Sequence, residues 1–457
     1  MNKVIILAAG EGTRMKSKIS KVLHKLCNKS ILSYIVESSK EALVEDIILV
    51  VGNNEDKVRE EFGDSVKYTR QHIGEGIPYG TGYAVKLCEE NINDDDNILV
   101  LTGDVPLITK ETISELINYH NEKKNDATVL SAIMDDPSGL GRILTDEEGM
   151  LVKIIEDRDC NEEQLKIKEI NSGIQIFNGK KLKSALNKLD ANNSQGELYI
   201  TDVFEILNKE GSNISTYKLK DNDEIKGIND KVQLVQVEAI MRRRINEQLM
   251  RDGVIIENPD TVTIQKGITI GRDTIIESNV KILGDTQIGE DSFIGMNSKI
   301  IDSKIGDNVK IYSSYIIESE IGDGSDVGPF SHLRPKSKLN KNVHIGNFVE
   351  VKNATLDDGT KAGHLAYIGD ADLGKRINVS CGVIFSNYDG KNKYRSTVGD
   401  DSFIGANVNI VSPINIEKKS FIAAGSTITK DVKTGQLAIE RAEQRNIDGY
   451  YKRKFNK

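Results

Sequence analysis

The chain has 457 residues and a formal net charge of −9, with 38% hydrophobic residues, 29% charged residues and no tryptophan. This length exceeds one ordinary hydrophobic core and predicts two or three domains. The acidic balance argues against a nucleic-acid-binding protein, and the apolar runs are too short to span a membrane. Four scattered cysteines without a CxxC pair favour a reducing, cytoplasmic compartment and disfavour disulfides or a structural zinc site.

The first 228 residues alternate short apolar strands with helical segments. We expect strands at 4–8, 47–51, 98–101 and 127–133, and helices at 31–42 and 110–122. The apolar stretch at the start is short and meets Gly and charge at once, so it predicts a strand rather than a signal peptide. The alternation predicts an α/β domain with a mainly parallel sheet, whose ligands bind beyond the carboxyl ends of the strands.

A glycine-rich turn follows the first predicted strand, in the string VIILAAGEGTRM. Gly10 and Gly12 allow backbone amides to approach an anion closely, and Arg14 and Lys21 supply positive charge. The string lacks the third glycine of a dinucleotide fingerprint and the GK[ST] ending of a P-loop. Without further context, a strand and a glycine turn are equally consistent with a simple tight loop.

An acidic residue, Asp104, ends a second apolar strand in the string LTGDVP. An isolated Asp after a strand is more often a turn former than a ligand. It nevertheless lies where parallel sheets bind their ligands. Further along, residues 229–252 contain no Gly or Pro and predict one connecting helix that ends at Gly253.

Aliphatic residues recur every six positions from Ile264 to Val351, with small slips, and again from Val398 to Ile428. Three such repeats build one triangular coil of a parallel β-helix, with each aliphatic side chain stacked inward. Glycines follow many of the aliphatic residues, and we expect them at tight corners with positive φ. The segment 381–397 shows no repeat, so we expect it to loop out, and the chain beyond Asp431 turns irregular before its basic end.

The string LAAGEGTRM followed by KVLH resembles the signature of sugar-1-phosphate nucleotidyltransferases. The resemblance implies a catalytic Mg²⁺ held by Asp104 and Asn229, since magnesium takes few protein oxygens beside water and phosphate. It also implies that Gln71 with Gly80-Thr81-Gly82 reads the uracil base, and that GLGRI, IIE and INSG contact N-acetylglucosamine. The full set implied to bind UTP or UDP-N-acetylglucosamine is Leu7, Ala8, Ala9, Gly10, Arg14, Lys21, Gln71, Gly80, Thr81, Gly141, Glu156, Asn171 and Asn229.

The repeat half carries GPFSHLRP, GNFVEVKNA, KAGHLAYIGD and SNYDG. A lone histidine is more often structural than catalytic. His364, however, stands in an AGHxxY string near basic residues suited to a sugar phosphate. A neutral imidazole there can take the proton from an amine that attacks a thioester carbonyl, so we expect His364 to be a general base.

Together the motifs resemble the bacterial bifunctional N-acetylglucosamine-1-phosphate uridyltransferase/glucosamine-1-phosphate acetyltransferases, from Val4 to Arg441. The resemblance implies a Rossmann-like mixed-sheet nucleotidyltransferase domain at 1–228, a helical arm at 229–252 and a left-handed β-helix acetyltransferase domain at 253–457. It implies glucosamine-1-phosphate binding by Arg334, Lys352, Tyr367, Asn378 and Lys393. It implies acetyl-CoA binding by Cys381, Asn387, Tyr388, Ala406, Ala424 and Arg441.

The resemblance further implies a homotrimer with the acetyltransferase site between subunits. Its substrates are small molecules, with acetyl-CoA and UTP as co-substrates, and its product feeds peptidoglycan and, where present, lipopolysaccharide synthesis. The chain departs from the family pattern at Ser20, at IPYGTGYA and at Ser380-Cys381. We expect Cys381 to be a buried small side chain rather than a nucleophile, and the departures to tune affinity rather than remove activity.

Two alternatives remain at this point. One is a monofunctional sugar-1-phosphate nucleotidyltransferase with a structural β-helix, which would have no need of His364 or the NYDG loop. The other is a non-catalytic trimeric scaffold with a decayed nucleotide site, which the presence of Arg14, Lys21, Asp104 and Asn229 disfavours.

Overall fold

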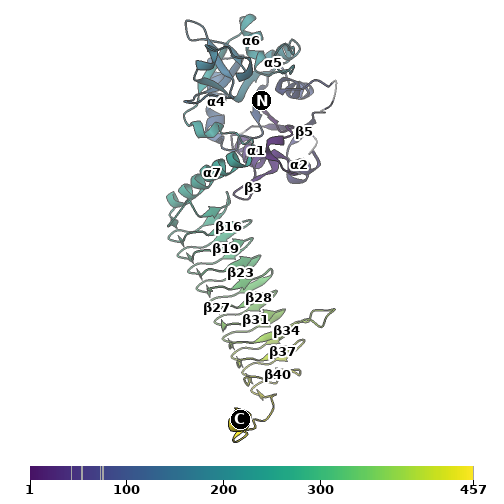
Figure 1. Ribbon diagram of the computed structural model, residues 1–457, viewed down its shortest axis with the longest axis vertical. Coiled ribbons are helices and arrows are strands. Elements are labelled where there is room, and N and C mark those ends of the chain that lie inside the picture. Colours follow the sequence, from purple (N-terminus) through teal and green to yellow (C-terminus); the bar gives the residue numbers. More distant parts are fainter. Residues whose placement is uncertain (43, 53–54, 73, 75–76, 456–457) are drawn as a thin grey trace. The chain divides into compact units, whose positions relative to one another are not determined.

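The computed structural model describes residues 1–42, 44–52, 55–72, 74 and 77–455. The chain divides into two compact units, Met1–Met241 and Arg242–Lys457, and Figure 1 shows an α/β unit and a long stack of strands. The helix α7 (Lys231–Arg251) begins in the first unit and ends in the second, where Gly253 follows with a φ of +103°. Among the described residues, each helix is too short or too polar to cross a membrane.

The first unit is built on a mixed sheet whose main path runs β11–β7–β10–β6–β1–β4–β5. Strand β10 is antiparallel to both of its neighbours, and the other adjacent pairs on this path are parallel. A β8–β9 hairpin adds to β10. The strands are β1 (Asn2–Leu7), β4 (Asp46–Val51), β5 (Lys67–Arg70), β6 (Asn97–Thr102), β7 (Ala127–Ile133), β8 (Arg142–Thr145), β9 (Leu151–Ile155), β10 (Glu169–Asn178) and β11 (Ile214–Lys218).

Helices pack on the sheet through alternating apolar side chains. On one face, Ile5, Val100 and Val129 share a buried cluster with side chains of α3, α5 and α6. The α-helices of this unit before α7 are α1 (Ile31–Glu41), α2 (Glu55–Phe62), α3 (Thr81–Lys86), α4 (Lys110–Lys123), α5 (Gly179–Leu186) and α6 (Asp202–Lys209). Each strand and helix predicted here from the sequence is confirmed within two residues at either end.

The second unit is a parallel β-helix of hexapeptide repeats, as the six-residue period predicts, and its pattern is that of a left-handed β-helix. Successive short strands, from β12 (Ile255–Ile256) to β41 (Leu437–Ala438), alternate among three sheets. We call these sheet I (β12 to β41), sheet II (β13 to β40) and sheet III (β14 to β38). The inward aliphatic side chains stack in register, as where Ile264 pairs with Ile282 three repeats later, and form one continuous core.

Glycine is needed at several repeat positions for a different reason from the one that the sequence suggests. Gly271, Gly289 and Gly405 do not have positive φ, and the corner positions with positive φ are instead often Asp or Asn, such as Asp291 and Asn297. A Cβ on Gly271 would lie 2.5 Å from the backbone nitrogen of Glu290 in the next coil. These glycines are therefore needed because the coils stack closely, and our prediction of positive φ was wrong for them.

The predicted loop-out at 381–397 is shorter than expected. Val383 and Phe385 are fully buried in the core, and β34 (Ile384–Ser386) pairs with the coils on either side. Phe385 lies six residues after Val379, so it continues the repeat with an aromatic in place of an aliphatic residue. The excursion itself covers 387–395 and ends at β35 (Ser396–Val398). Past the last coil, an exposed helix α8 (Tyr450–Phe455) carries the basic end.

Candidate active sites

The first candidate site lies at the carboxyl ends of the parallel strands. Leu7 ends β1 and Thr102 ends β6, while Gln71 directly follows β5 and its backbone N–H donates to Val51 O at 2.8 Å. Because β1, β4, β5 and β6 are parallel, these ends meet at one edge of the sheet. Gly103 allows this close approach, since a Cβ there would lie 2.8 Å from Leu7 O.

A smaller cavity of about 220 Å³ opens at this edge. Of the residues implied to bind the nucleotide or its metal ion, it is lined by Leu7, Ala9, Gly10, Lys21, Gln71, Gly80, Thr81 and Asp104. The segment before α3 is held in place because Leu198 N donates to Tyr79 O at 2.8 Å and Gly82 N donates to Leu198 O at 2.7 Å. Tyr79 and Glu197 also line this cavity, and the sequence did not single them out.

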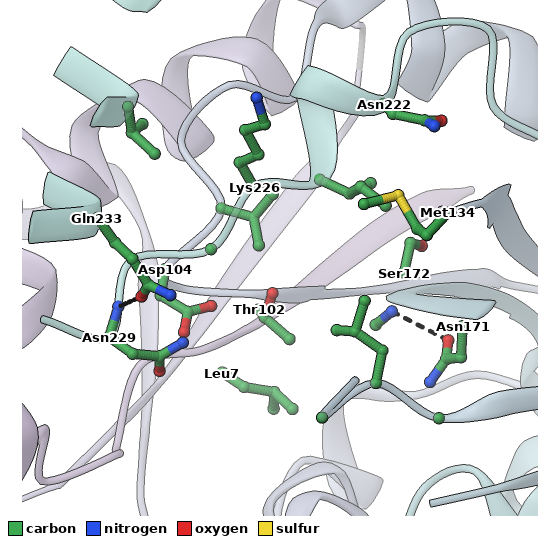
Figure 2. A pocket seen from close by; sticks show the side chains of 18 of the residues that line it. Leu7, Thr102, Asp104, Met134, Asn171, Ser172, Asn222, Lys226, Asn229 and Gln233 are labelled. Carbon is green, nitrogen blue, oxygen red and sulfur yellow. Dashed lines mark hydrogen bonds between the residues drawn. The ribbon is translucent and has the colours of Figure 1, made fainter. Parts of the chain in front are cut away.

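A larger cavity of about 910 Å³ adjoins it and shares Leu7, Thr81, Thr102 and Asp104 as lining residues. The β8–β9 hairpin supplies Gly141 before its first strand and Glu156 after its second, and Asn171 N donates to Gly141 O at 2.8 Å. In Figure 2, Asp104, Asn229 and Gln233 gather on one side of this cavity and Asn171 and Ser172 on the other, with Thr102 between them.

Glu156 is a half-buried acid at the wall of the larger cavity. Thr201 Oγ1 donates to Glu156 Oε1 at 3.0 Å. Burial raises the pKa of Glu156, and the hydrogen bond from Thr201 opposes that shift. Asp157, next to it, pairs with the buried guanidinium of Arg142 at 3.1 Å. The end of the β8–β9 hairpin thus presents the carboxyl group of Glu156 to the cavity, whereas the carboxylate of Asp157 is paired with Arg142.

Cationic side chains join Asp104 to Asn229 where the two cavities meet. Lys21 Nζ lies 2.6 Å from Asp104 Oδ2 and 3.3 Å from Asn229 Oδ1. Arg14 Nη2 donates to Asn229 Oδ1 at 3.0 Å. One carboxylate oxygen and one amide oxygen therefore face a single cation, and hard oxygens of this kind are the ligands that Mg²⁺ takes. The donor set fits the implied metal.

Two of the implied nucleotide residues lie outside both cavity linings. Ala8 is buried, and its backbone N–H donates to Val50 O at 2.9 Å. Arg14 is exposed and reaches Asn229 instead. Residues 73, 75 and 76, within the departure between Gln71 and Gly80, lie outside the described residues.

The second candidate site begins with a basic cluster on sheet II. Arg334 follows β25 (His332–Leu333), Lys352 ends β28 (Glu350–Lys352), and Lys393 comes from the excursion. Arg334 Nη1 pairs with Glu350 Oε1 at 2.7 Å. The contact with Lys393, more than desolvation and the charge of Arg334, lowers the pKa of Lys352. Three cations so close together favour the binding of an anionic ligand.

The excursion is anchored at both ends to carboxylates of the preceding coil. Asn387, which begins it, donates through Nδ2 to Asp370 Oδ2 and, at 3.4 Å, to Tyr367 Oη. Asp370 is itself buried and also accepts from Asn353 Nδ2. At the other end, Arg395 Nε donates to Asp372 Oδ2 at 2.6 Å. These bonds hold Asn387 beside Tyr367 of β31 (Tyr367–Gly369).

His364 ends β30 (Lys361–His364) on sheet I and is exposed. Its Nδ1 lies 3.0 Å from Asn347 Oδ1, on β27 (His344–Asn347) one coil earlier. An amide oxygen can only accept, so this contact makes Nδ1 the protonated nitrogen and leaves Nε2 as a proton acceptor.

The residues implied to bind acetyl-CoA, other than Asn387 and Tyr388, form a column along successive coils. Asn407 N donates to Cys381 O at 2.8 Å, Gly425 N donates to Ala406 O at 2.8 Å, and Arg441 Nη1 donates to Ala424 O at 3.0 Å. Cys381 is exposed, so our prediction of a buried side chain was wrong. It follows the core residue Val379 by two positions and lies at a corner, where the side chain points outward.

Two implied ligands lie apart from these groups. Tyr388, next to Asn387, is exposed and donates through its hydroxyl to Gly390 O at 2.6 Å. Asn378, on β33 (Asn378–Val379) of sheet I, donates to Ser380 Oγ at 3.1 Å rather than to the basic cluster. In one subunit, the implied acetyltransferase residues therefore form separate groups.

Comparison with known proteins assigns the family. A model described as Nucleotidyl transferase matches residues 3–248, Bacterial transferase hexapeptide (six repeats) matches 267–302, and Hexapeptide repeat of succinyl-transferase matches 396–430. A protein named Bifunctional protein GlmU from Clostridioides difficile (strain 630) is 49% identical over 100% of this chain and 98% of its own length.

Proteins of the same name from Enterococcus faecalis (strain ATCC 700802 / V583) and Alkaliphilus oremlandii (strain OhILAs) are each 49% identical. The first match covers 98% of this chain and 97% of the relative, and the second 99% and 98%. The chain belongs to the GlmU family. Membership confirms the predicted resemblance and the pair of activities, a uridyltransferase and an acetyltransferase, and it disfavours both alternatives raised from the sequence.

Proposed function

We propose that the second unit acetylates glucosamine 1-phosphate with acetyl-CoA, and that the first unit then transfers UMP from UTP to the N-acetylglucosamine 1-phosphate so formed. The products are UDP-N-acetylglucosamine and pyrophosphate, and the sugar nucleotide would feed cell-wall synthesis. The observation that carries the uridyltransferase assignment is the meeting of two cavities at Asp104. The smaller suits the nucleotide and the larger suits the sugar phosphate.

In this proposal, the phosphate oxygen of the sugar attacks the α-phosphorus of UTP, and the bond to pyrophosphate breaks as the new P–O bond forms. Asp104 and Asn229 would hold Mg²⁺, which when bound neutralises charge on the triphosphate and on the leaving pyrophosphate. Lys21 and Arg14 lie beside these two ligands and would orient the phosphates electrostatically. Gln71 and Gly80 would contact the base, and Gly141, Glu156 and Asn171 the sugar.

For acetyl transfer, Arg334, Lys352 and Lys393 would bind the phosphate of glucosamine 1-phosphate. The amine attacks the thioester carbonyl, the C–N bond forms and the C–S bond breaks. His364 Nε2 would take the proton from the amine and return it to the sulfur of coenzyme A. The bond between His364 Nδ1 and Asn347 supports this role, because it orients the ring and fixes the tautomer that a base needs.

We further propose that the β-helix forms a homotrimer through sheets I and II. The outward side chains of sheet III are all polar, namely Thr269, Gln287, Lys304, Glu320, Lys338, Thr355, Asp372, Thr397 and Asn415. Sheet I instead exposes stacked Phe403 and Phe421, and sheet II exposes Tyr315 and Ile384. A trimer would cover these apolar side chains and bring Asn378, Arg441 and the basic cluster of different subunits together. Light scattering measures this directly, and a monomer at working concentration would overturn it.

The domain boundaries that go with this function are 1–228 for the uridyltransferase, 229–252 for the helical arm and 253–457 for the acetyltransferase. Both co-substrates are intracellular metabolites, and the cysteines among the described residues are free thiols, which supports a cytoplasmic enzyme.

The test is an assay that follows free thiol and pyrophosphate separately. With glucosamine 1-phosphate, acetyl-CoA, UTP and Mg²⁺, thiol should appear first and pyrophosphate should follow. Pyrophosphate should appear without acetyl-CoA when N-acetylglucosamine 1-phosphate is supplied. A thiol signal that never appears, with normal pyrophosphate release from the acetylated sugar, would contradict the acetyltransferase half.

A further inference from the structure

A buried glutamine, Gln175, interrupts an apolar row of the first unit's sheet. On β10 it pairs with Val100 of β6 and with Val129 of β7, and Val100 pairs in turn with Ile5 of β1. The side chain of Gln175 is 1% exposed. A primary amide in such a row destabilises the fold unless its polar atoms find partners.

Gln175 lines the larger cavity and lies just past an irregularity in β10. The register between β10 and β7 shifts between Asn171 and Gln175, and Gly173 within this stretch has a φ of +80°. Both Asn171 and Gln175 line the cavity, together with Gly141 and Glu156. Gln175 does not line the smaller cavity that contains Gln71 and Gly80.

The hydrogen bonds identify which terminal atom of the Gln175 side-chain amide is the nitrogen and which is the oxygen. Asn171 Oδ1 accepts from Gly173 N at 2.9 Å, so this atom is an oxygen, and the group of Gln175 that faces it at 3.4 Å is the donor Nε2. Gln175 Oε1 is buried and has no hydrogen-bond partner within the part of the chain that the structure describes. Gln175 is one of the residues that line the cavity, and this oxygen needs a donor.

We infer that Gln175 Oε1 accepts a hydrogen bond from an N–H or O–H group of the sugar in the uridyltransferase site. The inference rests on the proposed function, because it takes the larger cavity as the sugar site. Gln175 presents an acceptor on the same strand as Asn171, whose role there is also inferred. An acetamido N–H and a ring hydroxyl are the two donors that an N-acetylhexosamine phosphate offers.

The test replaces Gln175 with methionine, which keeps the unbranched shape and removes the acceptor. Losing one neutral hydrogen bond should lower kcat/KM for N-acetylglucosamine 1-phosphate about three- to tenfold. The KM for UTP and the rate of acetyl transfer should stay as in the wild type. The matched control is Ile176→Val, which removes a methyl group from the next residue of β10 on the opposite face and should leave the KM for the sugar phosphate unchanged.

A series of deoxy sugar phosphates identifies the donor. Paired measurements on wild type and Gln175→Met use glucose 1-phosphate and its 2-, 3-, 4- and 6-deoxy forms. If the acceptor binds a ring hydroxyl, the loss caused by Gln175→Met should vanish with the analogue that lacks that hydroxyl. If it binds the acetamido N–H, the loss should be larger with N-acetylglucosamine 1-phosphate than with 2-deoxyglucose 1-phosphate.

A second variant, Gln175→Glu, keeps the carbonyl acceptor while its carboxyl is protonated, so its KM for the sugar should approach the wild-type value as pH falls. Gln175→Met with wild-type kinetic constants for every sugar phosphate would overturn the inference. An equal loss for all analogues and for UTP would also overturn it, since that result marks a structural role. Failure of the wild-type enzyme to transfer UMP at all would instead overturn the proposed function on which the inference rests.

Discussion

The two units present their candidate site residues in different ways. In the first unit, Leu7, Asp104 and Asn171 come from loops and strand ends far apart in sequence, yet they line adjoining cavities. In the β-helix, His364 has its contact with Asn347 one coil away, and Cys381, Ala406 and Ala424 form a column. A parallel sheet with crossover helices gathers strand ends at one edge, whereas a solenoid spreads residues along its surface. In the trimer that we propose, a second subunit would complete the solenoid site, whereas the α/β cavities are lined by residues of a single unit.

The largest effect that this comparison predicts is at His364. Replacing it with alanine should lower kcat for acetyl transfer about 10²- to 10⁴-fold, the usual contribution of a general base. Thiol release from acetyl-CoA with glucosamine 1-phosphate measures this. Uridyl transfer in the same preparation is the internal control and should be unchanged. A loss of both activities in folded protein would mean that the two sites are not separate.

The converse change is Asp104→Ala. It removes one of the two proposed metal ligands, so uridyl transfer should fall about 10²- to 10³-fold through lost electrostatic stabilisation. Pyrophosphate release at saturating UTP and N-acetylglucosamine 1-phosphate reports this. Acetyl transfer should keep its wild-type rate, and more Mg²⁺ should recover part of the lost activity. Near-normal uridyl transfer by this variant would place the metal elsewhere.

A smaller effect is expected at Asp370, whose carboxylate accepts from both Asn353 and Asn387. In Asp370→Asn, one of these two bonds is lost because the new amide has a single acceptor oxygen. We expect kcat/KM for acetyl transfer to fall about tenfold. The matched control is Asp358→Asn, which breaks an exposed ion pair with Lys375 at 3.0 Å and should change the rate less than twofold. Equal effects of the two variants would show that Asp370 does not position Asn387.

The smallest effect is a shift in pH dependence. Lys393 lowers the pKa of Lys352, so the cluster loses charge at a lower pH than isolated lysines would. Affinity for a phosphate should accordingly weaken as pH rises through that lowered pKa. In Lys393→Met the pKa of Lys352 should rise toward its ordinary value, and the alkaline limb should move to higher pH. Inhibition of acetyl transfer by N-acetylglucosamine 1-phosphate, which lacks an amine, measures this against pH, and an unmoved limb would contradict it.

Much of the fold follows from the sequence because its periods are strong. The six-residue repeat predicts the β-helix, and the stretch without Gly or Pro predicts α7 within two residues at its start and one at its end. The sequence did not predict that Phe385 belongs to the repeat, because an aromatic side chain there occupies an aliphatic position. The repeat glycines were assigned the wrong cause because coil-to-coil contact is a tertiary constraint, which local conformational preference does not reveal.

The candidate sites were less predictable where side chains depend on register. Asn347 precedes His364 by one coil, so the repeat holds the information once the coil length is known. Thr102 lies within LTGDVP, two residues before Asp104, the residue that the sequence singled out. Gln175 carries no signal of its own, because a single glutamine in an apolar strand does not reveal that it lines a cavity. Asp370 lies within the quoted KAGHLAYIGD string, but its role appears only when the excursion folds back onto it.

Mixing the two single variants tests the account of two separate sites most directly. His364→Ala and Asp104→Ala are each supplied with glucosamine 1-phosphate, acetyl-CoA, UTP and Mg²⁺, alone and together. Alone, neither should form UDP-N-acetylglucosamine at more than about a hundredth of the wild-type rate. Together they should form it readily, because one variant acetylates the sugar and the other adds UMP to it. A mixture as inactive as its components would contradict the assignment of one activity to each unit.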